Sequence, residues 1–329
     1  MPKTIKDSPL SAETLAILFT KLKTMESAGL PAFQAVDVLQ ESESALKQPL
    51  KRMQNHLRKG MPVSEAGYKA GIFNSTHKTL IHAAESSGTL AAVYGQLASY
   101  YSGLSSRIKK VKSRLYLPVF VLTVALFVQP IPALVQSDIT PFDYLSMTVG
   151  RLMLISASVY FLIKSPRIFE SLGLLSFYDD LLLKIPAVSG WIIKRQINGF
   201  YFILALMLEA GVAFSDALPK AVDTIKNTRL QACFKPALAA LGSGGRVTEI
   251  LSNVSVLNRS ALQIINSSEH SGQLASGLQR YTRLESETLN LQDEALAEWL
   301  PRAVYTLICI WMAYSIVGSN FGSIMPTDL

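Results

Sequence analysis

A long apolar stretch without a single charge limits what this chain can fold into. It runs from Leu115 to Val135 and reads LYLPVFVLTVALFVQPIPALV. A helix of this length, rising about 1.5 Å per residue, crosses the roughly 30 Å hydrocarbon core of a bilayer. Residues 144–163, with one charge at Arg151, and residues 299–318, with Arg302 near their start, form two more such stretches. Because apolar residues elsewhere recur at helical spacing, the sequence predicts an all-α membrane protein with three transmembrane helices.

Basic residues flank these stretches on one side only. A basic run precedes the first stretch, and it consists of Arg107, Lys109, Lys110, Lys112 and Arg114. The loop 136–143 contains two aspartates and no Lys or Arg, and the tail 319–329 contains no basic residue. Since Lys and Arg are enriched on the cytoplasmic side, residues 1–114 and 164–298 are predicted to be cytoplasmic. The loop and the tail then face the opposite side of the membrane, with 115–135, 144–163 and 299–318 as the membrane spans.

The net charge of +7 is concentrated in the first cytoplasmic part. Residues 1–114 contain 16 basic and 8 acidic side chains, whereas residues 164–298 contain 13 of each. Proximity to the membrane explains the basic run, so we expect no nucleic-acid partner. An acidic partner bound to the first part is the alternative interpretation of the charge excess.

The two cytoplasmic parts contain the same pattern. Residues 60–90 align with residues 244–274 without a gap, and nine of the 31 positions are identical. Upstream, MESAGLPAFQAV at 25–36 matches MLEAGVAFSDAL at 207–218 with a slightly smaller offset. Each copy then leads into an apolar stretch, which indicates a duplicated helical module.

Capping residues divide each module into helices. In the first copy, Ser11 is a candidate N-cap and Gly29 ends the following helix, while Asn74 or Ser75 caps a later helix that stops at Gly88. The second copy repeats this order with Gly211, Asn258 and Gly272.

Both copies contain Glu followed, after a short spacer, by Ser-Gly-x-Leu. These corner residues are Glu85, Gly88, Leu90, Glu269, Gly272 and Leu274. The glycine is expected to adopt the left-handed conformation after a helix end, and the leucine to pack back. A glutamate in a last helical turn is disfavoured by the helix dipole, so it needs a further reason. It either accepts hydrogen bonds from a neighbouring helix start or contacts a partner or a metal ion.

The sequence contains no pattern typical of an enzyme. The glycine cluster at 242–245 is not followed by Gly-Lys-Ser/Thr, so it is not a phosphate loop. The four histidines show no metal-binding spacing, and the sequence contains neither a serine nucleophile elbow nor a Cys/His pair typical of a catalytic site. We therefore expect a non-enzymatic protein without catalytic, cofactor-binding or metal-binding residues.

Arg151 is a candidate functional residue because it lies inside a predicted span. Its side chain can reach the interface or bond to another helix, and a role in transport is the alternative. Pro130 and Pro132 are expected to bend the outer end of the first span.

Several segments together resemble one known family. They are the paired SAGLPAFQAV and EAGVAFSDAL, RKGMPVSEA followed by AESSGTL, DDLLLKIPAVSGWI before FYFILALMLEAG, and the prolines Pro118 and Pro301 that open two spans. In this order, over residues 11–318, they resemble the F-protein/PilC family of inner-membrane platform proteins in bacterial type II secretion and type IV pilus assembly.

The resemblance implies two homologous cytoplasmic six-helix bundles, three spans and a homo-oligomer in the inner membrane. It also implies a role that connects a cytoplasmic assembly ATPase to pilin or pseudopilin subunits, alongside other inner-membrane assembly proteins. A small membrane transporter or channel subunit is the alternative function, although few polar residues are available to line its spans.

Overall fold

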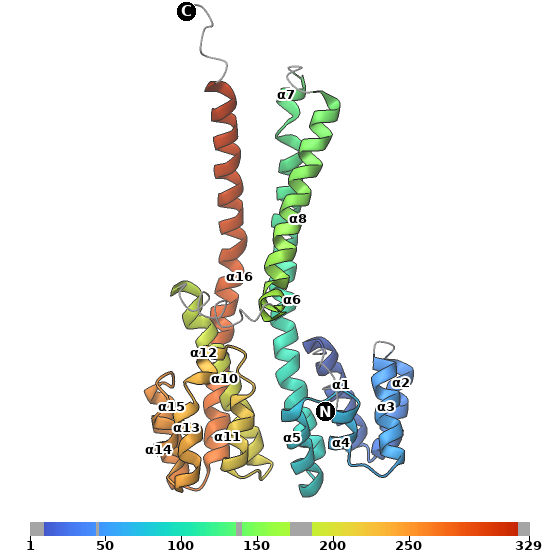
Figure 1. Cartoon of the computed structure of the whole chain (residues 1–329), viewed down its shortest axis with the longest axis vertical. Coiled ribbons are helices and arrows are strands. Elements are labelled where there is room, and N and C mark those ends of the chain that lie inside the picture. Colours follow the sequence, from blue (N-terminus) through green and yellow to red (C-terminus); the bar gives the residue numbers. More distant parts are fainter. Residues whose placement is uncertain (1–9, 44–45, 136–139, 172–185, 322–329) are drawn as a thin grey trace, which may run out of the picture. The chain divides into compact units, whose positions relative to one another are not determined.

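The computed structural model describes residues 10–43, 46–135, 140–171 and 186–321, and every regular element in these ranges is a helix (Figure 1). Most of the predicted tail and half of the predicted loop lie outside the described residues. The chain divides into two compact units. The bundle unit comprises Met1–Ser106 and Ser176–Leu289, and the long-helix unit comprises Arg107–Leu175 and Asn290–Leu329.

The first repeat begins with five helices of the bundle unit. They are α1 (Ala12–Ser27), α2 (Ala32–Ser42), α3 (Lys47–Arg58), α4 (Val63–Lys69) and α5 (Ser75–Ser87). The Ser11 side chain accepts a hydrogen bond from the Thr14 N–H, and Asn74 accepts one from the His77 N–H. The N-caps predicted at Ser11 and Asn74 are therefore confirmed.

The second repeat follows the same order with one difference. Its helices are α10 (Pro186–Glu209), α11 (Phe214–Val222), α12 (Thr228–Ala232), α13 (Lys235–Ala239), the 3-10 helix η2 (Ala240–Ser243), α14 (Val247–Ser252) and α15 (Arg259–His270). Where the first repeat has the single helix α3, the second has three short pieces. Pro236 lies in the first turn of α13, where its missing N–H and its ring prevent continuation from α12.

Both repeats contribute side chains to the hydrophobic core of the bundle unit. Phe19 and Phe73 come from the first repeat and Phe200 and Phe234 from the second, and all four are almost completely buried. Burial of each such side chain contributes roughly 1.5–3 kcal/mol. Since both repeats belong to one unit, the expectation of two separate bundles is not established.

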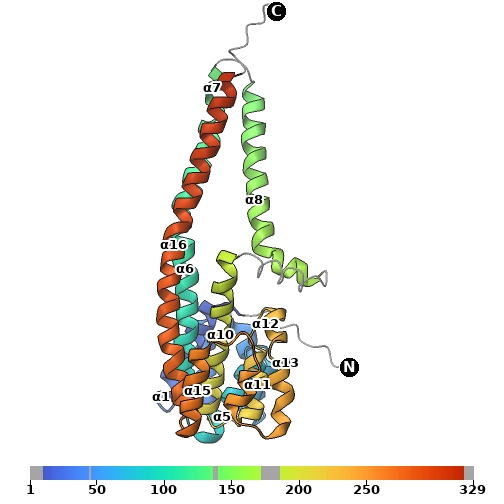
Figure 2. The ribbon, with the colours of Figure 1, turned by 90° about the vertical axis from the view of Figure 1, so that its left-hand side faces the viewer.

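The remaining helices are long, apart from one short piece. They are α6 (Leu90–Val128), α7 (Ile131–Val135), α8 (Pro141–Ser171) and α16 (Leu274–Phe321). Figure 2 shows α16 as one continuous helix. Among the described helices, α6 alone is long and apolar enough to cross a membrane, and Pro301–Ala313 within α16 is a shorter apolar stretch. The three spans therefore stay a prediction.

The outer end of the first predicted span contains a break in the helix. Helix α6 ends at Val128 and α7 starts at Ile131, so the helix is interrupted in the region where Pro130 and Pro132 were expected to bend it. Pro130 lies in this break and explains it, because a proline cannot donate the backbone hydrogen bond that continuation of α6 requires.

Candidate functional site

Glu85 lies near the end of α5 and binds the start of α4. Its Oε1 accepts a hydrogen bond from the Val63 N–H at 2.5 Å. Its Oε2 accepts two from Ser64, one from the backbone N–H at 3.2 Å and one from the hydroxyl at 2.6 Å. Because Pro62, at the N-cap position of α4, has no side-chain acceptor, Glu85 satisfies N–H groups that α4 leaves unpaired.

Glu269 makes the same contacts in the second repeat. It accepts hydrogen bonds from the Val247 N–H at 2.6 Å, the Thr248 N–H at 3.0 Å and the Thr248 hydroxyl at 2.6 Å. Burial raises the pKa of Glu269, but these hydrogen bonds and the nearby Arg246 charge outweigh burial and lower the pKa overall. The two carboxylates thus cap α4 and α14 from outside those helices.

The same corners turn the chain into the long helices. Gly88 and Gly272 have φ angles of 71° and 67°, the left-handed conformation that glycine adopts without steric cost. Leu90 and Leu274, the first residues of α6 and α16, pack against the hydrophobic core. Each corner therefore joins three helices, and its glutamate contributes negative charge to a helix start, where the helix dipole favours it.

These contacts agree with the hydrogen-bonding interpretation of the two glutamates. Their carboxylate oxygens are occupied by backbone and hydroxyl donors. In the part of the chain that the structure describes, no group of three or more His, Cys, Asp or Glu residues is arranged to hold a metal ion.

The basic run at the start of the first predicted span pairs with acids on α16. Lys110 Nζ lies 2.8 Å from Glu294 Oε1, Arg107 Nε lies 3.8 Å from an Asp293 carboxylate oxygen, and Arg114 Nη1 lies 3.7 Å from a Glu298 oxygen. Lys109 and Lys112 on the same helix are exposed. Besides their proposed effect on topology, Arg107, Lys110 and Arg114 therefore join α6 to α16.

This ion-pair ladder follows the sequence repeat. Lys110 and Glu294 have the same separation in sequence as equivalent positions of the two aligned copies, and so do Arg114 and Glu298. Equivalent positions of the repeat therefore carry opposite charges and face each other. The basic residues alone do not predict this pairing, and the signal for it in the sequence is the opposite charges at equivalent positions.

Arg151 forms a hydrogen bond between helices. Its Nη1 donates to Gln129 Oε1 at 2.7 Å, and the Tyr144 hydroxyl donates to the Phe127 carbonyl at 2.9 Å. These contacts join α8 to the last turn of α6 and to Gln129, the residue that follows α6. An arginine inside a predicted span is expected to have such a polar partner, so the interhelical interpretation accounts for Arg151 without a transport role.

His77 is a core residue whose environment the sequence analysis missed. Its ring lies among Phe19, Phe73 and Tyr101, and its Nε2 lies 2.7 Å from the Tyr101 hydroxyl. Its Nδ1 accepts a hydrogen bond from the Asn74 N–H, which places the ring proton on Nε2. Burial lowers the pKa of His77 to about 4, so the ring is neutral at neutral pH. The signal for this position in the sequence is that His77 lies three residues after the N-cap Asn74, where a side chain can accept a hydrogen bond from the N-cap N–H.

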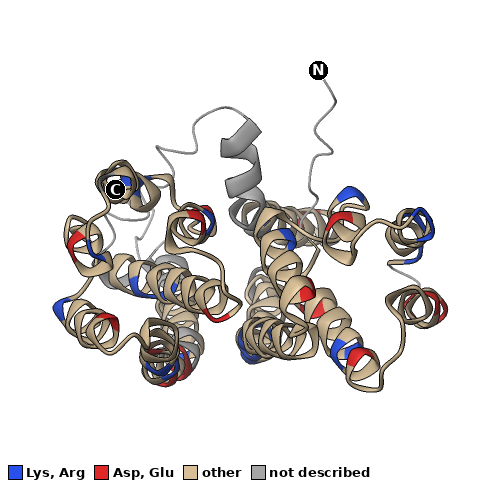
Figure 3. Ribbon diagram, turned by 90° about the horizontal axis from the view of Figure 1, so that it is seen from below, with Lys and Arg blue, Asp and Glu red and all other residues tan. Residues whose placement is uncertain are grey.

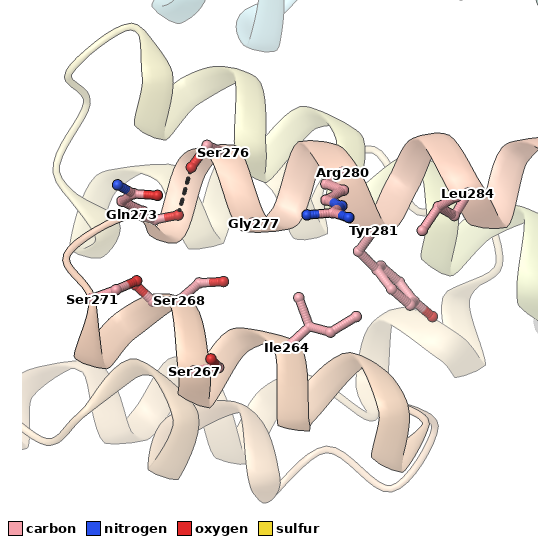
Figure 4. Close-up of a pocket in the computed structure, with 10 residues that line it drawn as sticks. All are labelled: Ile264, Ser267, Ser268, Ser271, Gln273, Ser276, Gly277, Arg280, Tyr281 and Leu284. Carbon is pink, nitrogen blue, oxygen red and sulfur yellow. Dashed lines mark hydrogen bonds between the residues drawn. The ribbon is translucent and has the colours of Figure 1, made fainter.

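An open cleft of about 550 Å³ lies between α15 and α16 (Figure 4). Small polar side chains dominate it, including Ser267, Ser268 and Ser276, and Arg280 lies at its exposed side. The helices approach closely here, since a Cβ on Gly277 would clash with the Ser268 hydroxyl. Among the described residues that line the cleft there is no His, Asp or Glu, so its serines have no visible means of activation.

Comparison with known proteins addresses the two repeats directly. A sequence model of the family described as "Type II secretion system (T2SS), protein F" matches residues 18–135 and 200–319, more than half of the chain. The chain belongs to the type II secretion system protein F family. The starts of the two matched stretches are related by the smaller offset of the sequence repeat, and their ends are related by the larger one.

Two curated relatives of this family member carry names from pilus assembly. The type IV pilus assembly protein PilC of Thermus thermophilus is 25% identical over 256 residues, which cover 70% of this chain and 62% of the relative. The type IV pilus assembly protein TapC of Aeromonas hydrophila is 22% identical over 304 residues, which cover 85% of this chain and 73% of the relative. The match thus spans less than two thirds of the Thermus protein.

Proposed function

We propose that this chain is an inner-membrane platform protein of a type II secretion or type IV pilus assembly machine. In this role it links a cytoplasmic assembly ATPase to pilin or pseudopilin subunits. The observation that carries the proposal is the double family match, in which each half runs from the bundle unit into a long helix. The names of the two relatives from pilus assembly support it.

The continuous helices suit a protein that transmits force or conformational change. Helices α6 and α16 both start at a corner that Glu85 or Glu269 braces, and both continue beyond the bundle unit. A movement of the bundle unit can therefore reach the long-helix unit along unbroken backbone. The proposed role is non-enzymatic, because the ATPase supplies the work and this chain receives it.

The proposed topology follows the basic flanks. Residues 1–114 and 164–298 are cytoplasmic, 115–135, 144–163 and 299–318 are the spans, and the loop and the tail are periplasmic. The protein assembles as a homo-oligomer with other inner-membrane assembly proteins. Pilin-like transmembrane helices are proposed to contact the spans beside the break at Pro130.

Crosslinking in living cells tests the proposal. Photoreactive residues are placed across residues 11–135 and 190–318 of the full-length chain, and captured proteins are identified by mass spectrometry. We expect an assembly ATPase from the bundle unit and a prepilin-like protein from the long-helix unit. Deletion of the gene should abolish fibre assembly or secretion while the ATPase stays folded and present. Capture of neither protein, with fibres and secretion intact in the deletion strain, would show that the platform role is wrong.

A further inference from the structure

The outward face of α3 is strongly basic. The helix buries Leu50, Met53 and Gln54 and turns its other side to solvent. Five exposed cations lie on this side and at the helix end, and we call them the α3 basic face: Lys47, Lys51, Arg52, Arg58 and Lys59. Residues four apart share a helix face, so Lys47 and Lys51 lie side by side.

The cations of this face are not neutralised within the described part of the chain. Elsewhere in the bundle unit, Lys21 pairs with Glu43, and both Lys69 and Lys78 pair with Glu65. On the α3 basic face, Lys47, Lys51, Arg52 and Lys59 have no carboxylate within 4.0 Å among the described residues, and Arg58 lies over the Phe33 ring at 5.2 Å.

The neighbouring helix α2 does not compensate this charge. Its Asp37 accepts a hydrogen bond from Gln54 instead of pairing with a cation. Figure 3 colours Lys and Arg blue and Asp and Glu red. Of the two outer helices at its right-hand side, where Figure 1 places α2 and α3, one carries blue ribbon and the other carries red ribbon. The charges therefore stay segregated between the two helices.

The second repeat shows that the fold does not require this charge. The segment that takes the place of α3 there consists of α12, α13 and η2, residues 228–243, and contains two cations, Arg229 and Lys235. The two repeats follow the same helix order, yet one has a continuous basic helix and the other an interrupted, mostly uncharged segment. A feature present in one copy alone points to an interaction of that copy.

We infer that the α3 basic face docks an acidic surface of a cytoplasmic protein, which under the proposed function is the assembly ATPase. An amphipathic helix that binds a lipid surface offers exposed apolar side chains for insertion. In α3, the apolar Leu50 and Met53 are inside the core, with exposed fractions of 0% and 1%. The face therefore offers charge alone, which favours complementary protein carboxylates and rapid, salt-sensitive association.

The experiment compares two variants of the full-length protein with equal loss of charge. The test variant combines Lys47→Gln, Lys51→Gln, Arg52→Gln and Lys59→Gln and leaves Arg58 on the Phe33 ring. The control variant combines Lys226→Gln, Lys235→Gln, Arg259→Gln and Arg280→Gln, four exposed positions of the second repeat. Binding of each purified protein in nanodiscs to the ATPase of the same cell is measured at low and high salt.

We expect the test variant to bind the ATPase about tenfold more weakly than wild type at low salt, because each exposed ion pair contributes a small factor. The control variant should bind as wild type does, and the difference should shrink at high salt. Equal binding by the test and control variants would overturn the docking surface while leaving the proposed function standing. A wild-type protein that binds no ATPase would overturn both.

Crosslinking from the face distinguishes a lipid surface from a protein. A photoreactive residue at Gln48 or Asn55, both exposed on α3, should capture the ATPase in cells. If the test variant instead loses binding to vesicles that contain phosphatidylglycerol, and Gln48 captures lipid alone, the face is a membrane contact and the inference is wrong.

Discussion

Glu85 accepts two hydrogen bonds from Ser64, one from its backbone N–H and one from its hydroxyl, and Glu269 repeats both with Thr248. Each pair joins the end of one helix to the start of the helix that precedes it in the chain. A Ser at one position and a Thr at the other preserve the hydroxyl donor. Because the following residues open α6 and α16, each pair fixes the point from which a long helix leaves the bundle unit.

Replacement of either glutamate should destabilise the protein. Glu85→Gln or Glu269→Gln keeps the shape but loses the charge and one acceptor position, so the free energy of unfolding should fall by about 1–3 kcal/mol. Thermal unfolding of the full-length protein in detergent, followed by circular dichroism, measures the loss. Glu41→Gln on the exposed side of α2 is the control and should unfold as wild type does. Unchanged unfolding of both test variants would contradict the capping role.

The corner glycines should resist substitution. Gly88→Val or Gly272→Val places a β-branched side chain at a positive φ, which costs roughly 1 kcal/mol or more. The same unfolding measurement applies. Gly190→Ala in α10 is the control, because nothing lies within 4 Å of its added Cβ and its φ is not positive. Loss of stability in this control equal to that in the variants would rule out the conformational explanation.

His77 should make stability depend on pH. The pKa of this histidine is about 4 in the folded protein, below its ordinary value of 6.5, so the unfolded chain binds more protons between these values. The contribution of His77 to the free energy of unfolding is complete above pH 6.5. It falls as the pH decreases towards 4, by about 3 kcal/mol in total. Unfolding midpoints from pH 7 to 4 should show the decline in wild type and less of it in His77→Gln. His82→Gln, an exposed neighbour, should retain the wild-type decline.

Local signals predicted the helix ends well. Ser11 and Asn74 cap helices as expected because an N-cap depends on residues within one turn. The helix order of the first repeat predicts one continuous third helix in the second repeat. The structure has a break there instead, because Pro236 cannot continue a helix from α12.

Contacts between distant residues were less predictable. The sequence placed Glu85 in an unfavourable last turn, but its partner at Ser64 depends on how α4 and α5 pack. In the same way, the basic run indicated topology alone, because nothing local brings Glu294 to Lys110. The duplication supplies the missing information, because equivalent positions of the repeat face each other where α6 and α16 pair.

The proposed topology predicts which sites a membrane-impermeant thiol reagent can reach. In a chain with Cys233 and Cys309 replaced by Ser, cysteines at Ser137 and Thr327 should react in intact spheroplasts, because both sites are assigned to the periplasm. These two positions lie outside the described residues. A cysteine at Asn55, exposed on α3, should react only after permeabilisation. Reaction of Asn55→Cys in intact spheroplasts would reverse the orientation.

Charge reversal tests whether the ladder between α6 and α16 is needed for the proposed work. Lys110→Glu places two carboxylates where an ion pair of 2.8 Å stood, so α6 and α16 should separate at this level and fibre assembly or secretion should fall. The exchange Lys110→Glu with Glu294→Lys restores the attraction and should recover much of the activity, since contacting residues show coupled effects in a double-mutant cycle.

Lys112→Glu is the matched control, because it makes the same change in charge on the same exposed helix at a position without an ion pair among the described residues. It should reduce assembly less than Lys110→Glu does, which separates the ion pair from the positive-inside effect on topology. Cysteine labelling of each variant verifies that the orientation is unchanged. If the exchange fails to recover activity, or if Lys112→Glu is as harmful as Lys110→Glu, the basic run acts through its charge alone and the contact with α16 is not required.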